Sequence, residues 1–171
     1  MGKEMSMKKE LVGTFLANRK LTYDLINTLS DQQLDILWSR PGLNSFRKHF
    51  MEMISVQDAF SNAIESKVMS FDLVPDVYSY NEKMEKNKII EEMKRADQRL
   101  LELFEEASET KRILWFDMEL SLFSHLSNLI QHEVFHQGMM TLALYENKIS
   151  IPASWIENWA LPESNLVQNE A

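Results

Sequence analysis

Apolar residues recur at spacings of three and four along most of the chain, which is the period of an amphipathic helix. In the first such stretch, Leu11, Phe15 and Leu25 fall on one helical face. Four long stretches show this period, and they cover about residues 5–29, 45–66, 81–107 and 117–145. The pattern predicts an all-α protein, a four-helix bundle in a single domain.

Shorter signals surround the long helices. Ser30 and Gln33 have capping-box spacing and predict a short helix, and Pro152 is placed to begin another near the end of the chain. Residues 67–80 and 108–116 lack a sustained helical period and are expected to be connections. We therefore expect short extra helices around one bundle that spans residues 1–171.

Composition narrows the class of protein further. The 171 residues include only 4 Gly and 4 Pro, which favours long uninterrupted elements over the many turns of a barrel. The net charge of −8 would repel phosphate backbones and anionic lipids, so we expect neither a nucleic-acid nor a membrane partner. No leader and no apolar run of about 20 residues is evident, which predicts a cytoplasmic location.

The chain has no cysteine. Disulfides, thiolate metal ligands and a catalytic thiol supplied by the protein are therefore excluded. Any thiol chemistry would need an exogenous thiol.

The four histidines all fall on predicted long helices. His132 and His136 differ by only about 40° around the helix and about 6 Å along it, so both rings can reach one ion. A third nitrogen from a facing helix would complete a three-ligand site with open positions, and His49 can supply it. The prediction is a divalent metal ion held by His49, His132 and His136. The alternative is that these are hydrogen-bonded core histidines.

Other polar residues near these histidines have several candidate roles. His125 shares the face of His132 but lies about 10 Å away along the axis, so we expect it in a pocket wall or the core. Glu133 is placed to orient an imidazole, to act as a catalytic general base, or to make an interhelix polar contact unrelated to the metal. Glu52, one turn after His49, could orient that ring in the same way.

Residues 132–136 also match H-E-x-x-H, the zinc-peptidase signature in which Glu133 would activate water. Gly138 follows the second histidine by two residues instead of three, however, and no later histidine completes the extended pattern. Little β-branched alternation is present to build the sheet of such peptidases. The helical bundle is therefore favoured.

Several pieces of sequence occur in an order that resembles the DinB/YfiT-like family of bacterial four-helix metalloproteins. They are LSD at 29–31, WSRP at 38–41, His49, ADQRLL at 96–101 and HExxHxG at 132–138. The resemblance implies the same bundle and the same ligands, His49, His132 and His136. Met139 departs from the polar Gln that often follows the glycine, which predicts a more apolar pocket near the metal.

The resemblance also implies a range of functions. Activities in the family include bacillithiol transfer and mycothiol-dependent isomerisation, so the first expectation is a metal-dependent thiol S-transferase. It would act on small electrophiles with an exogenous low-molecular-weight thiol and use one divalent ion, zinc or nickel. The alternatives are a metal-dependent hydrolase and a non-catalytic, metal-binding stress-response module.

A homodimer is expected as well. The resemblance implies it, and four apolar residues near the start of the chain favour it: Met5, Met7, Phe15 and Leu16.

Overall fold

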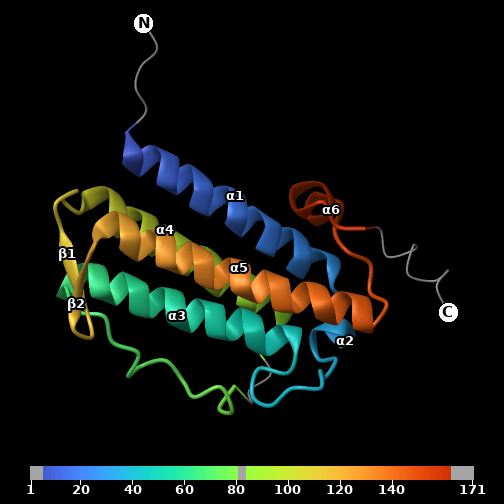
Figure 1. The fold of residues 1–171 in the computed structure, drawn as a ribbon. Helices are drawn as coiled ribbons and strands as arrows, with labels where there is room; N and C mark the ends of the chain where they lie inside the picture. The colour runs from blue at the N-terminus through green and yellow to red at the C-terminus, as the bar shows by residue number, and fades with distance from the viewer. Residues whose placement is uncertain (1–5, 81–83, 163–171) are drawn as a thin grey trace, which may run out of the picture.

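Four long helices lie side by side in the computed structural model, which describes residues 6–80 and 84–162 (Figure 1). They are α1 (Met7–Thr28), α3 (Phe46–Ser66), α4 (Lys86–Glu106) and α5 (Leu122–Glu146). Two short helices, α2 (Asp31–Leu34) and α6 (Ala153–Trp159), accompany them. The predicted all-α four-helix bundle is confirmed.

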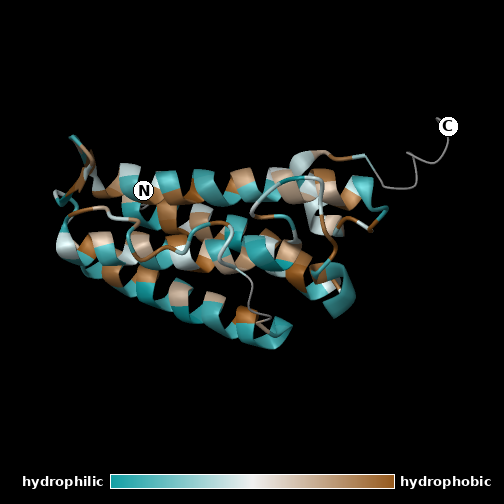
Figure 2. Ribbon diagram, turned by 90° about the horizontal axis from the view of Figure 1, so that it is seen from below, coloured by the Kyte–Doolittle hydropathy of each residue, from teal (hydrophilic) through white to brown (hydrophobic). Residues whose placement is uncertain are grey.

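Packing contacts place each long helix between two others. Helix α3 contacts α4 and α5, and α1 contacts the same two helices from the other side. In Figure 1 the connection after α3 runs back along the bundle, so α3 and α4 point the same way while α1 and α5 point the opposite way. Brown and teal alternate around the helices in Figure 2, as expected for helices that bury one face.

Serine side chains determine where several helices begin. Ser6, Ser45 and Ser121 each accept a hydrogen bond from a backbone N–H in the first turn of α1, α3 and α5. Ser30 and Gln33 form the predicted capping box at α2. Helix α4 begins at Lys86, later than the expected residue 81, and residues 81–83 lie outside the described part of the chain.

One connection differs from its prediction. Strands β1 (Arg112–Trp115) and β2 (Met118–Ser121) form an antiparallel hairpin, so α5 starts at Leu122 and not at residue 117. Backbone hydrogen bonds also join Leu114 to Lys67 and Met69, which ties the hairpin to the segment after α3. Pairing across the hairpin therefore replaces the first turn that the helical pattern predicted.

Among the described residues, no helix is both long enough and apolar enough to cross a membrane.

Candidate metal centre

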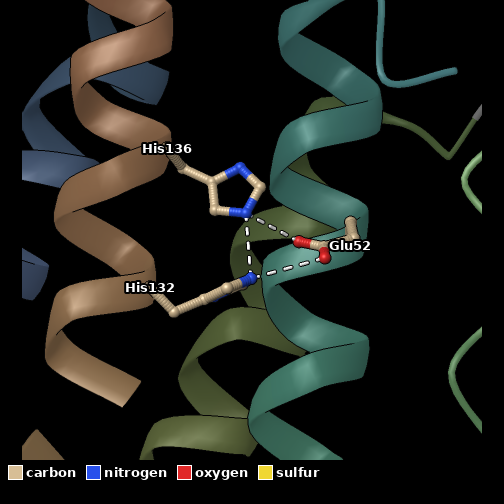
Figure 3. Close-up of side chains that lie close together, drawn as sticks. All are labelled: Glu52, His132 and His136. Atoms are coloured by element: carbon tan, nitrogen blue, oxygen red, sulfur yellow. Dashed lines mark hydrogen bonds and ion pairs between the residues drawn. The ribbon is translucent and has the colours of Figure 1, made fainter. Parts of the chain in front are cut away.

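Helices α3 and α5 face each other and bring three possible ligands together (Figure 3). Nε2 of His136 lies 2.9 Å from Oε2 of Glu52 and 3.0 Å from Nε2 of His132. Nε2 of His132 lies 3.4 Å from Oε1 of Glu52. Glu52, His132 and His136 thus form a group that could hold a metal ion.

The spacing of these atoms fits a small divalent ion. Ligands about 2.0–2.1 Å from a tetrahedral zinc ion stand about 3.3 Å from one another, close to the separations observed here. Two histidines and one glutamate are also a known donor set of catalytic zinc sites. His132 and His136 bring their Nε2 atoms together from successive turns of α5.

The hydrogen bonds of His49 indicate which nitrogen of His136 carries a proton. His49 Nε2 lies 3.1 Å from the carbonyl oxygen of Leu43, and because that oxygen only accepts, Nε2 must donate. His49 Nδ1 then accepts from Nδ1 of His136, 2.7 Å away. Nε2 of His136 is therefore unprotonated and directs its lone pair at Glu52. Two acceptors this close repel unless a cation lies between them.

The prediction that His49 is itself a ligand is untested, yet its position differs from that expectation. Its ring contacts the far nitrogen of His136, while Glu52 occupies the position facing the two Nε2 atoms. Trp38 packs on the His49 ring with centroids 4.5 Å apart. Glu52 therefore joins His132 and His136 as a candidate ligand, and His49 is placed to orient the ring of His136.

Burial and charge favour the deprotonated forms that bind metal. Burial, with a contribution from the nearby His136 ring, lowers the pKa of His49 to about 3. Burial also lowers the pKa of His136. For Glu52, burial raises the pKa, but the interactions with the adjacent His132 and His136 rings outweigh it and lower the pKa to about 2. A carboxylate beside neutral imidazoles is the state that a metal ligand set requires.

Glu133 lies on another face of α5. It is 1% exposed, accepts a hydrogen bond from Thr22 Oγ1, and has one oxygen 3.4 Å from Arg19 Nη1. Burial raises its pKa. Its role as a general base stays a prediction, and its contacts in the structure are with α1.

His125 is buried away from the ligand group, as expected. Its Nε2 lies 3.0 Å from the carbonyl oxygen of Phe60, and its Nδ1 accepts a hydrogen bond of 2.9 Å from Trp115 Nε1. The ring is therefore neutral with the proton on Nε2, and it fixes the indole of Trp115.

A pocket of about 490 Å³ opens next to the ligand group, with Glu52 and His132 in its wall. This volume lies within the range of small-molecule sites. Sequence reasoning missed that Trp115 and Phe71 would join this pocket, because neither belongs to a helix.

Comparisons with known proteins agree with the fold. The sequence pattern of the DinB family matches residues 2–147, and the chain belongs to the DinB family. A DinB-like protein from Bacillus cereus ATCC 10987 is similar, with a TM-score of 0.67 and 14% identity over 85% of this chain and 95% of that one. The DinB-like protein YjoA from Bacillus subtilis gives a TM-score of 0.60 and 16% identity over 81% and 92%. No curated protein sequence matches the chain.

Proposed function

We propose that this protein is a divalent-metal-dependent thiol S-transferase that joins an exogenous low-molecular-weight thiol to a small electrophile. One observation carries the proposal: Glu52, His132 and His136 converge on a single point at the wall of a 490 Å³ pocket. A divalent ion bound there would act as a Lewis acid and lower the pKa of a thiol. The absence of cysteine fits this chemistry, because the thiol must come from outside.

Each residue has a distinct part in this proposal. Glu52, His132 and His136 hold the ion, with zinc or nickel as the candidates, since imidazole suits both. His49 keeps the proton of His136 on Nδ1, which leaves Nε2 free to ligate. The pocket wall holds the electrophile near the ligands.

The reaction balances without a redox partner. The sulfur attacks an electrophilic carbon, a C–S bond forms, and the leaving group departs with its bonding electrons while the thiol proton passes to solvent. With 1-chloro-2,4-dinitrobenzene as the electrophile, the leaving group is chloride.

The test measures thiol consumption. Zn²⁺- or Ni²⁺-loaded protein is mixed with bacillithiol or mycothiol and 1-chloro-2,4-dinitrobenzene. We expect metal-dependent loss of thiol above the protein-free rate, and a return to that rate in Glu52→Ala. Thiol loss at the protein-free rate for every metal and thiol would overturn the proposal.

A hydrolase is the second candidate, because two histidines and a glutamate also hold the zinc of thermolysin-type enzymes. Release of 4-nitrophenolate from 4-nitrophenyl acetate without any thiol, together with no thiol consumption, would establish hydrolysis instead. Failure of both assays would favour the non-catalytic module.

We also propose a homodimer. Met7 and Leu16 are 61% and 46% exposed on α1 and could pack between copies, whereas Phe15 is fully buried in the core and cannot contribute. Met5 lies outside the described residues. Light scattering at micromolar concentration should give twice the 20.1 kDa chain mass, and a mass near one chain would contradict the dimer.

A further inference from the structure

We propose that the pocket beside the candidate metal centre binds the electrophile, and that this electrophile is an uncharged aromatic molecule with one hydrogen-bonding group. The inference rests on the proposed function and specifies its substrate class. It is carried by the chemistry of the pocket wall and by the way that wall is held in place.

Most of the wall is apolar and comes from four parts of the fold. Helix α3, the segment after it, strand β1 and helix α5 each contribute. The apolar lining residues are Val56, Phe60, Phe71, Val74, Trp115 and Phe135. Such a surface is favourable for an apolar ligand, since burial of apolar area is the main source of its affinity.

Three of the rings form one aromatic corner. Trp115 meets Phe60 edge to face at 5.3 Å and Phe71 edge to face at 6.1 Å. Planar ligands gain from offset-stacked or edge-to-face contacts of this kind beyond the area that they bury. The corner therefore favours a flat ring over an aliphatic group of equal size.

Hydrogen bonds hold the Trp115 side of the corner in place before any ligand binds. Trp115 donates to His125 Nδ1, and His125 donates in turn to the Phe60 carbonyl, so one imidazole connects β1 to α3. A wall fixed in this way loses little conformational freedom on binding. His125 is thus a positioning residue for the ring site.

The polar part of the lining is confined to α5 and Glu52. Asn128 and Gln131 bring neutral amides that donate and accept hydrogen bonds, and both lie within about one turn of His132. They can orient one uncharged polar group of a ligand whose ring rests in the aromatic corner. The reactive atom then points at Glu52 and His132.

The side chains of the pocket wall favour an uncharged ligand over an anionic one. No lysine or arginine occurs among the described residues that line the pocket. Arg40, which contributes to the lowered pKa of His49 and His136, lines a separate pocket of about 170 Å³ with Trp38 and Met139. A carboxylate placed in the aromatic pocket would lose its hydration without gaining a cationic side chain, which is costly.

The test compares matched ligands by calorimetry, with no thiol and no turnover. The probes are 4-nitrobenzamide, anionic 4-nitrobenzoate and non-planar cyclohexanecarboxamide, each titrated into the protein with and without Zn²⁺. We expect 4-nitrobenzamide to bind at least tenfold more tightly than cyclohexanecarboxamide in both states. In the metal-free protein it should also bind at least tenfold more tightly than 4-nitrobenzoate.

A charge variant isolates the contribution of the wall from that of the ion. Gln131→Lys places a cation at the exposed edge of the pocket, and it should shift the benzoate-to-benzamide affinity ratio at least tenfold toward benzoate under each metal condition. Gln98→Lys, the same exchange on the exposed face of α4, should leave the ratio unchanged.

A ring variant tests the aromatic corner. Phe71→Ala should weaken 4-nitrobenzamide about three- to tenfold. Trp159→Ala, at a partly exposed ring on α6 outside the lining, should leave binding unchanged.

The inference is overturned if 4-nitrobenzoate binds the metal-free protein as tightly as 4-nitrobenzamide, or if Gln131→Lys leaves the ratio unchanged. These results are independent of the thiol assay. Binding as expected without thiol consumption would contradict the S-transferase alone, and thiol consumption without this binding preference would contradict the substrate class alone.

Discussion

At the scale of single residues, backbone carbonyls determine the state of two buried histidines. The Leu43 carbonyl fixes the proton of His49 on Nε2, and the Phe60 carbonyl does the same for His125. Each ring then uses Nδ1 as an acceptor, from His136 in one case and from Trp115 in the other. In both cases a backbone carbonyl determines the tautomer of the histidine. The Nδ1 atom then orients the candidate ligand His136 or the pocket-wall residue Trp115.

His125 should make the stability of the metal-free protein depend on pH. Burial lowers its pKa to about 4, whereas an unfolded histidine titrates near 6.5. The unfolded chain therefore takes up this proton first, and stability falls as pH drops from about 6.5 toward 4. At pH 5.5 the loss relative to pH 8 is about 1.4 kcal/mol.

His125→Phe removes this contribution, so its unfolding free energy, measured by urea denaturation, should change less over the same pH range by about that amount. The variant should also be less stable at pH 8 by about 1–3 kcal/mol, because the Phe60 carbonyl and the Trp115 N–H lose their partner. Parallel pH curves for the two proteins would contradict the assignment.

The choice between His49 and Glu52 shows where residue-level prediction ends. The two lie three positions apart on α3, about 60° around the helix, so spacing places both toward α5. Only the packed structure shows that the Leu43 carbonyl engages His49 and that Glu52 faces the His132–His136 pair. The spacing of that pair, in contrast, lies within one helix and was visible in the sequence.

At the scale of elements, the helices were predictable and the hairpin was not. Three- and four-residue spacing and serine caps mark the helices, because these signals are local. The hairpin strands have four residues each, and their two-residue turn, Phe116 and Asp117, lacks the glycine or asparagine that announces a turn. Four residues are too few to reveal the alternation of a strand, which has a period of two.

Glycine at the first position of the hairpin turn should stabilise the protein. Phe116 has a positive φ of 53° and Asp117 does not, which matches a type II′ turn, where glycine is preferred at the first position. Phe116→Gly should therefore raise the unfolding free energy by about 1 kcal/mol, measured by thermal or urea denaturation. Asp117→Gly is the control and should not stabilise, because its φ needs no glycine. Equal effects of both variants would contradict this explanation.

At the scale of the whole molecule, one buried arginine connects the four long helices. Arg19 of α1 bonds Gln57 of α3, lies 3.1 Å from Asp97 of α4, and lies 3.4 Å from Glu133 of α5. It is 2% exposed and places a buried cation beside two carboxylates, Asp97 and Glu133. This contact also connects α5, which carries two candidate ligands, to the rest of the bundle.

Arg19→Met should destabilise the fold by about 3–5 kcal/mol, because it leaves Asp97 and Glu133 buried without a cation. Lys20→Met is a matched control at the next residue, where the ion pair with Asp24 is largely exposed, and it should cost no more than about 1 kcal/mol. Urea denaturation at pH 7 measures both. Equal costs would show that the buried cluster is not a cross-link between helices.

Metal stoichiometry in single variants tests the central claim most directly. After equilibrium dialysis against Zn²⁺, with circular dichroism to confirm folding, the wild-type protein should hold close to one ion per chain. Glu52→Ala, His132→Ala and His136→Ala should lose it, while His49→Ala should retain one ion with about 10- to 100-fold weaker affinity. Full metal in Glu52→Ala together with loss in His49→Ala would contradict the account and establish three histidine ligands.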